Sequence, residues 1–192
     1  GLASPDLQLL FTPASYAQGV FRQLEREPGM TVAVCPVRPE SRGTIMAQSP
    51  DPFAYPAIRP NYLSASGDLR VLIAGINYTR RIFAQPAMAP HTLEETVPGP
   101  GVATDQQFAD FARAAGTNVF HPVGTCKMGT DPMAVVDPRL RVNGIQGLRV
   151  IDASVMPAVT TGNTNAPTIM IGEKGAAMIQ EAPRATAQAA AA

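Results

Sequence analysis

The sequence predicts an α+β fold in which separate helices accompany a small antiparallel sheet, and three observations lead to this prediction. The segment Met30–Val37 alternates along its length and is rich in β-branched side chains, which is typical of a strand. After a turn at Arg38–Gly43, the segment Thr44–Gln48 continues as a second strand, so the pair resembles an antiparallel hairpin. The 16 glycines and 19 prolines make up about 18 % of the chain, against ~12 % in ordinary domains, and indicate many turns.

Helical periodicity predicts four helices around these strands. Apolar side chains recur at helical spacing in residues 15–27, before Pro28 and Gly29, and again in residues 66–84, where Asp68 suits the helix dipole. Residues 104–115 begin with a capping pattern, in which Thr104 is followed three residues later by Gln107. Residues 166–179 form the last helix, with Asn165 as its expected cap. Its expected inward-facing residues are Ile169, Met170, Ala176 and Ile179.

Shorter features fill the gaps between the helices. One short extended stretch is expected near Ile58, and residues 85–101 are expected to form an exposed connection. Leu148–Ile151 has the composition of a short buried strand that stops at Asp152. The alanine-rich tail, residues 185–192, is expected to be frayed.

Charge and composition exclude several classes of protein. The chain has 192 residues, and 15 basic side chains balance 15 acidic ones, so no electrostatic footprint for nucleic acid is present. No apolar run approaches the roughly 20 residues of a membrane span. Two cysteines, Cys35 and Cys126, are too few and too far apart for a zinc site or a disulfide scaffold. Because the chain begins at Gly1 without an initiator Met, we expect it to be a piece of a longer protein.

Three polar clusters could carry chemistry. His121 lies beside Pro122 in a glycine-rich loop, and its near-neutral pKa range makes histidine a natural proton acceptor, although a structural histidine is an open alternative. The other histidine, His91, is better interpreted as a solvated loop residue. Asp152 follows the predicted strand, where a carboxylate can contact a nucleotide or simply cap a loop. Residues 160–167 run into the last helix, whose free amides suit an electron-rich group.

Two other enzyme classes receive little support from these clusters. His121, Asp137 or Asp152, and Ser154 could be written as a hydrolase triad, but Ser154 lacks the G-x-S-x-G turn that exposes such a nucleophile. A G-x-G-x-x-G phosphate loop is also absent, because Gly99-Pro100-Gly101 lacks the third glycine.

Three blocks of the sequence resemble the C-terminal signature of the glucose-methanol-choline (GMC) oxidoreductase family, most closely its choline dehydrogenase-like branch. The blocks are HPVGTCKMG at residues 121–129, VVDPRLRVNGIQGLRVIDASVMP at 135–157 and TTGNTNAPTIMIGEK at 160–174. RPESRGTI at residues 38–45 resembles the part of the family that comes earlier in the chain. The resemblance covers nearly the whole chain up to Ile179.

The resemblance implies an FAD enzyme that oxidises an alcohol by hydride transfer to flavin N5. His121 matches the active-site histidine that accepts the hydroxyl proton, and Asn163 matches the residue that hydrogen-bonds the substrate oxygen. The remaining matches are positions near the cofactor: Phe120 close to the flavin, Asp152 and Ala153 at the FAD phosphate and ribityl region, and Thr164 and Asn165 at the N1–O2 edge of the ring. No metal is implied.

The resemblance also implies a division of the chain. Residues 1–117 would belong to an antiparallel substrate-binding domain, and 118–183 would supply active-site loops with the returning strand and C-terminal helix of a Rossmann-like FAD-binding domain. Residues 184–192 would be a disordered tail. The expected partners are an N-terminal FAD-binding segment and a small-molecule alcohol. Without the N-terminal segment, the chain would hold FAD weakly. An FAD-containing hydroxynitrile lyase and a non-catalytic structural subunit remain alternatives.

Overall fold

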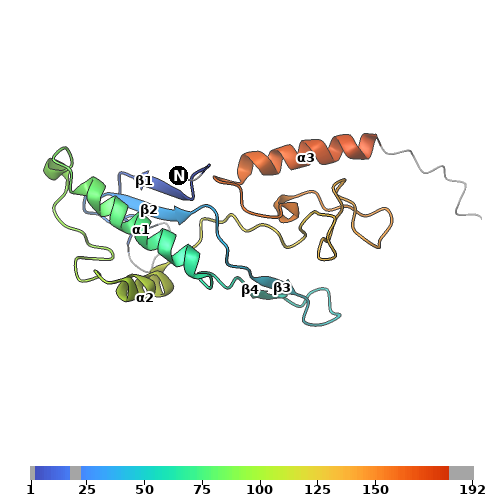
Figure 1. Ribbon diagram of the computed structural model, residues 1–192, viewed down its shortest axis with the longest axis horizontal. Helices are drawn as coiled ribbons and strands as arrows, with labels where there is room; N and C mark the ends of the chain where they lie inside the picture. Colours follow the sequence, from blue (N-terminus) through green and yellow to red (C-terminus); the bar gives the residue numbers. More distant parts are fainter. Residues whose placement is uncertain (1–2, 18–22, 182–192) are drawn as a thin grey trace, which may run out of the picture. The chain divides into compact units, whose positions relative to one another are not determined.

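The computed structural model describes residues 3–17 and 23–181. The chain forms two compact units, Gly1–Val119 (unit 1) and Phe120–Ala192 (unit 2), which are described separately below. Both contain helices, and the sheets are small and antiparallel (Figure 1), so the expected mixture of helices with antiparallel strands is confirmed. In the described part of the chain, no helix is long and apolar enough to cross a membrane.

The first sheet of unit 1 pairs β1 (Leu7–Thr12) with β2 (Thr31–Pro36) in antiparallel register, from Leu7 opposite Pro36 to Thr12 opposite Thr31. The second sheet pairs β3 (Thr44–Met46) with β4 (Ala57–Arg59). The strands expected at residues 30–37, at 44–48 and near Ile58 are therefore confirmed, but the expected hairpin is wrong. The strand at residues 30–37 pairs with β1, which the sequence pattern did not reveal, and the strand at 44–48 pairs with β4.

Helix α1 (Ser66–Phe83) packs on β2 and confirms the helix predicted over residues 66–84. Gly75 lies at the contact, where an added Cβ atom would come within 2.5 Å of Val34 Cγ1. A larger residue would therefore push the helix away from the sheet.

The N-terminus of α1 is tied to the turn before β3 by Asp68, whose side chain is buried. Its carboxylate accepts hydrogen bonds from the Glu40 amide at 2.7 Å and from the Ser41 amide at 2.9 Å. Burial disfavours the charge, but the hydrogen bonds from Ser41 and Glu40 outweigh it and lower the pKa of Asp68. One ionised side chain thus fixes this turn.

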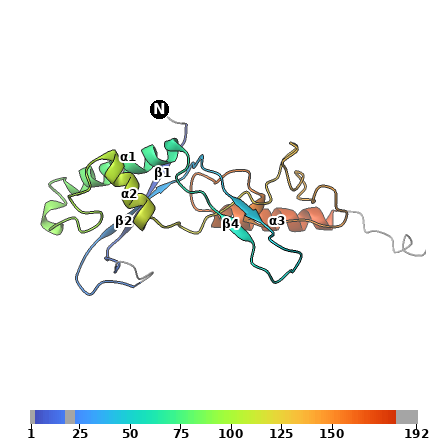
Figure 2. The same ribbon diagram turned by 90° about the horizontal axis from the view of Figure 1, so that it is seen from below.

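Helix α2 (Asp105–Ala115) lies beside α1 in both ribbon views (Figures 1 and 2). Its capping box is formed as predicted: the Thr104 hydroxyl accepts from the Gln107 amide, and the Gln107 side chain accepts from the Thr104 amide. Phe108 is the most deeply buried residue of this helix at 1 % exposure, and the Arg80 guanidinium lies 4.9 Å from its ring centre.

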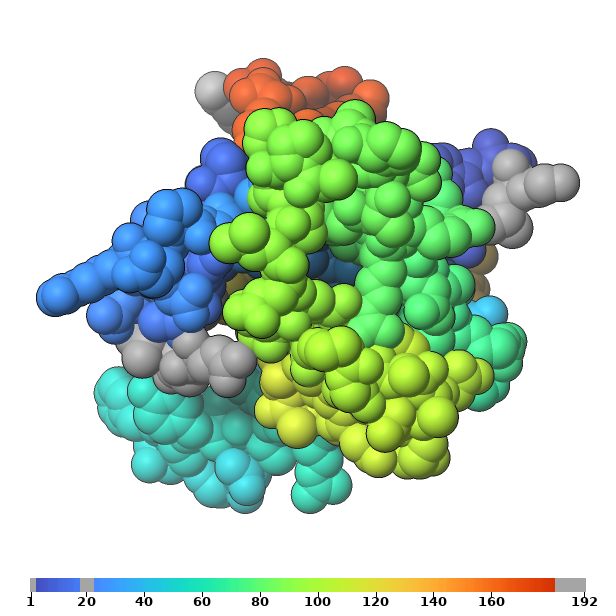
Figure 3. Space-filling model, turned by 90° about the vertical axis from the view of Figure 1, so that its left-hand side faces the viewer, coloured from blue at the N-terminus to red at the C-terminus, as the bar shows by residue number. Residues whose placement is uncertain are grey.

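The connection between these helices runs over the surface of unit 1, as Figure 3 shows in lime green. It includes a 3-10 turn, η1 (Ala89–His91), in which His91 is exposed as expected. Arg80 anchors it from α1 through two hydrogen bonds to Glu95, at 2.8 and 2.7 Å, and further bonds to the Gly99 and Val102 carbonyls.

The helix predicted over residues 15–27 is wrong for the residues that the structure describes. Tyr16 and Leu24 form an antiparallel bridge, the Glu25 amide donates to the Ser15 carbonyl at 2.9 Å, and the Ala17 amide donates to Gln23. Residues 18–22 lie outside the described part.

Unit 2 is built around a small core with little regular structure. Val136, Leu140, Val155, Met156 and Ile171 are buried together. The strand predicted at Leu148–Ile151 is wrong: only a bridge between Arg141 and Arg149 forms there, and Leu148 is 47 % exposed. Hydrogen bonds between successive turns, such as Val142 to the Leu148 carbonyl at 3.0 Å, replace a strand.

Helix α3 (Asn165–Gln180) confirms the helix predicted over residues 166–179, but its expected inward face is wrong. Ile169, Met170 and Ile179 are more than half exposed, and Ala176 is exposed as well. The buried positions are Ile171 and Gly175, where an added Cβ would lie 2.5 Å from Ile151 Cγ2. The tail expected to be frayed lies outside the described residues.

Candidate active site

The loop that carries His121 has a constrained backbone. Phe120, directly before the histidine, has φ 59°, in the left-handed region that a bulky aromatic residue rarely adopts. Pro122, directly after it, disfavours helical backbone at His121. Gly124 has φ 90° and packs against the Met156 carbonyl. The half-buried imidazole is therefore attached to a backbone that has few accessible conformations.

Two backbone hydrogen bonds join this loop to the segment that follows Asp152. The Cys126 amide donates to the Ser154 carbonyl at 3.0 Å, and the Met128 amide donates to the Val155 carbonyl at 2.8 Å. Val155 is completely buried and anchors the pair of segments in the core of unit 2. The first and second polar clusters of the sequence are thus brought together.

Asp152 caps the short 3-10 helix η2 (Ala153–Val155). Its Oδ1 atom accepts a hydrogen bond from the Ser154 amide at 2.7 Å, so the loop-capping alternative is confirmed. The Asp152 side chain is also exposed, and Ala153 beside it is half-buried. A capping carboxylate retains a second oxygen, which leaves it able to accept a further hydrogen bond.

The third cluster meets the first through one side-chain hydrogen bond. His121 Nδ1 lies 2.9 Å from Thr164 Oγ1, across 43 residues of sequence. Thr164 is only 7 % exposed and stands at the start of α3. No group within residues 3–17 and 23–181 forms a hydrogen bond with Nε2 of the same ring. The bond holds the ring by its Nδ1 atom.

This contact changes how α3 begins. Thr164, and not the expected Asn165, occupies the N-cap position, and its side chain makes no capping hydrogen bond. The Thr164 backbone is helical, the third residue of α3 is Pro167 without an amide hydrogen, and the Thr164 hydroxyl faces His121. The first amides of α3 consequently lack a side-chain partner, and such amides attract electron-rich or anionic groups.

The other expected site residues lie next to these contacts in the chain. Phe120 is 60 % exposed, and Asn163 and Asn165, on either side of the buried Thr164, are both exposed. Unit 2 therefore holds every expected site residue: His121 and Thr164 touch directly, and the Asp152 segment is joined through the loop backbone. The role of the Thr164 hydroxyl had no local signal, because only the fold brings the two residues together.

The hydrolase triad is wrong. His121 Nδ1 meets a hydroxyl and not a carboxylate, and Asp152 is used as a cap. Asp137 accepts from Arg141 Nε at 2.7 Å and from the Arg139 amide at 2.8 Å. Burial opposes its charge, but these bonds lower the pKa of Asp137.

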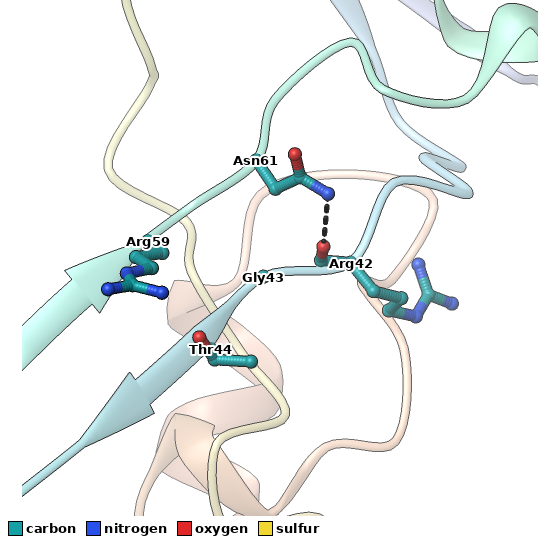
Figure 4. Close-up of a pocket in the computed structure, with 5 residues that line it drawn as sticks. All are labelled: Arg42, Gly43, Thr44, Arg59 and Asn61. Atoms are coloured by element: carbon teal, nitrogen blue, oxygen red, sulfur yellow. Dashed lines mark hydrogen bonds between the residues drawn. The ribbon is translucent and has the colours of Figure 1, made fainter.

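One pocket of unit 1 lies apart from these residues in the sequence. It has a volume of about 400 Å³ and is lined by Arg42, Gly43, Thr44, Arg59 and Asn61 (Figure 4). The two guanidinium groups point away from each other, and the Asn61 amide donates to the Arg42 carbonyl at 3.0 Å. None of the expected site residues lines it. The described residues also contain no cluster of three acidic, histidine or cysteine side chains for a metal.

Comparison with known proteins identifies the family. The GMC oxidoreductase family model matches residues 39–172. An alcohol dehydrogenase [acceptor] of Pseudomonas putida is 46 % identical over 175 residues, which are 91 % of this chain and 32 % of that protein. An oxygen-dependent choline dehydrogenase of Pseudomonas fluorescens is 45 % identical over 190 residues, covering 95 % of this chain and 33 % of the relative.

A solved structure extends the similarity to the fold. A formate oxidase of Aspergillus oryzae, studied for modification of its FAD, matches with a TM-score of 0.77 and 29 % identity. The match covers 93 % of this chain and 32 % of the oxidase. The chain thus spans about a third of the length of the proteins that it matches. Its sequence and its fold together show that it belongs to the GMC oxidoreductase family.

Proposed function

We propose that this chain is the C-terminal portion of an FAD-dependent alcohol dehydrogenase or oxidase, and that His121 is its base. The observation that carries the proposal is the hydrogen bond between His121 Nδ1 and Thr164 Oγ1. It holds the one histidine of unit 2 at the start of α3, with Nε2 directed to no protein group among the described residues. A fixed imidazole with one unengaged nitrogen is what general-base catalysis requires.

The chemistry of the donors fits FAD. The first amides of α3, at Asn165 and Ala166, have no side-chain cap and suit the electron-rich N1–O2 edge of the flavin. Asp152 and Ala153 would contact the phosphate and ribityl region, and Phe120 would lie near the ring. When bound, FAD supplies the hydride acceptor.

The residues of this chain would then orient the alcohol and accept its proton. His121 Nε2 takes the proton of the substrate hydroxyl, and Asn163 donates a hydrogen bond that orients the substrate oxygen. Because Asn163 directly precedes Thr164 in the chain, the same turn before α3 would position both groups. Relatives that oxidise alcohols and choline, by their names, support an alcohol as the substrate class.

The remaining FAD contacts would come from an N-terminal region, since the relatives are about three times as long as this chain. Unit 1 would form part of the substrate-binding domain, and α3 would complete a Rossmann-like FAD-binding domain. The pyrophosphate cradle of such a domain is a glycine-rich loop, which this sequence lacks.

The test is anaerobic flavin reduction by an alcohol in the full-length protein. His121→Ala should slow it by about 10²–10⁴-fold, the usual contribution of a general base. His91→Ala is the matched control, because His91 is the only other histidine of this chain and lies exposed in unit 1. An unchanged reduction rate in His121→Ala would refute the role of His121.

A further inference from the structure

We propose that Thr164 is a positioning residue whose hydroxyl accepts the Nδ1 proton of His121 and so keeps the lone pair of Nε2 available. The inference rests on the function proposed above, in which Nε2 receives the proton of the alcohol. It adds a role for the side chain of Thr164, which the family resemblance places only as a backbone contact of the flavin.

The direction of the hydrogen bond follows from which ring nitrogen carries the proton. A neutral imidazole carries one proton, on Nδ1 or on Nε2. If the Thr164 hydroxyl donated to Nδ1, the proton would sit on Nε2, and neither nitrogen could take another from substrate. With Nδ1–H donating to Thr164 Oγ1, the substrate O–H bond can break as the Nε2–H bond forms. The same Nδ1–H···Oγ1 bond then persists in the imidazolium.

The backbone of Thr164 is held in place from the helix side. The Thr168 amide donates to the Thr164 carbonyl at 3.0 Å, and the Thr168 hydroxyl donates to the same oxygen at 2.6 Å. Thr164 is buried, and its hydroxyl does not cap α3. An N-cap threonine ordinarily uses its oxygen for the helix amides. Here the third residue of α3 is Pro167, which has no amide hydrogen to donate to a cap, so the Thr164 hydroxyl is left to face His121.

The histidine is held from the loop side. Phe120 and Pro122 limit the backbone of His121, as described above, but a ring can still rotate about its side-chain bonds. The 2.9 Å bond to Thr164 fixes that rotation and selects which nitrogen faces outward. Orientation and tautomer are thus set by one neighbour, as a carboxylate does in hydrolase triads.

The proposal is tested by the tautomer of His121 in the full-length protein labelled with ¹⁵N-histidine. Long-range ¹H–¹⁵N correlation spectra distinguish the two neutral tautomers, and the His121 signals are those that His121→Gln removes. We expect Nδ1–H in the unmodified protein and in Thr164→Ser, and an Nε2–H population in Thr164→Val. Thr79→Val is the matched control, because it removes a threonine hydroxyl that donates to the carbonyl four residues earlier in α1 of unit 1 and has no bond to Thr164 or His121.

The same variants are compared in kcat/KM with an alcohol. Loss of one orienting hydrogen bond should lower kcat/KM about tenfold in Thr164→Val, while Thr164→Ser recovers most of the loss. An Nε2–H tautomer in the unmodified protein, or an unchanged tautomer in Thr164→Val, would overturn the role of Thr164. That outcome is distinct from failure of the proposed function, which the His121→Ala reduction rate reports independently.

Discussion

The two units of this chain differ in how they hold their important side chains. Unit 1 contains both sheets and helices α1 and α2, yet none of the expected site residues lies in it. Unit 2 has one long helix and otherwise turns joined by isolated bridges, and it carries all of them. Loops fixed on a small core can keep backbone amides and side chains available to a ligand, whereas a strand ladder uses its backbone amides in its own hydrogen bonds. Under the proposed function, the regular unit would be a scaffold and the irregular one would present the reacting side chains.

If unit 1 is a scaffold, the truncation of its most buried side chain should give the largest loss of stability. Phe108→Ala should lower the free energy of unfolding by about 3–5 kcal/mol, because it leaves a cavity under the Arg80 guanidinium. Urea unfolding measures this loss. Gln106→Ala, exposed on the same helix, should change it by less than about 0.5 kcal/mol. Equal effects would mean that α2 is not part of the core of unit 1.

The buried carboxylate of unit 1 should give the next largest effect. Asp68→Asn should lower the free energy of unfolding by about 2 kcal/mol at neutral pH, because an amide side chain has one acceptor oxygen where the carboxylate serves the Glu40 and Ser41 amides with two.

The pH dependence of stability has a definite sign. Because the folded-state pKa of Asp68 is lowered, its stabilisation is complete above the unfolded-state pKa of about 3.9 and is lost as pH falls through the folded value. Acid unfolding followed by circular dichroism should show a weaker dependence below about pH 4 in Asp68→Asn. Asp110→Asn, exposed on α2, should keep the original profile; an identical profile in both variants would contradict the role of Asp68.

Two glycines of α3 test how tightly unit 2 is packed. Gly175→Ala should destabilise by about 1–3 kcal/mol, because its Cβ would overlap Ile151. A Cβ atom added at Gly172 would meet no atom within 4 Å beyond the neighbouring backbone of its own helix. Gly172→Ala should therefore stabilise the helix by up to about 1 kcal/mol. The midpoint temperature of thermal unfolding should therefore fall in Gly175→Ala and rise in Gly172→Ala. A shift in the same direction would show that α3 does not pack on Ile151.

The smallest expected effect concerns a helix cap of unit 1. Thr104→Ala removes the side-chain acceptor of the Gln107 amide and should cost about 1 kcal/mol in unfolding free energy. Thr104→Ser keeps a hydroxyl and serves as the control. If the alanine and serine variants have the same free energy of unfolding, the capping box contributes nothing to the stability of unit 1.

Local signals predicted the helices of both units. The capping box of α2 and the apolar spacing of α1 depend on residues within one or two helical turns, and both were confirmed. The helical spacing at residues 15–27 failed because the bridge between Tyr16 and Leu24 satisfies the backbone in another way. Short apolar runs do not distinguish these two outcomes.

Long-range pairing could not be predicted from the sequence. Nothing within residues 30–37 specifies that β2 pairs with β1 instead of β3, since register depends on the whole fold. The same limit hid the contact between His121 and Thr164 and the inward position of Gly175 on α3. The candidate site residues were proposed from their motifs, whereas their contacts came only from the fold.

The separation of 43 positions between His121 and Thr164 also has a consequence for the newly made chain. At about 5–20 residues per second, a ribosome needs about 2 to 9 seconds to add the partner after the histidine. Throughout that interval the imidazole has no α3 to hold it, although α1 and α2 have already been made. A transcript that stopped before Asn163 would therefore encode all of the scaffold and no oriented histidine.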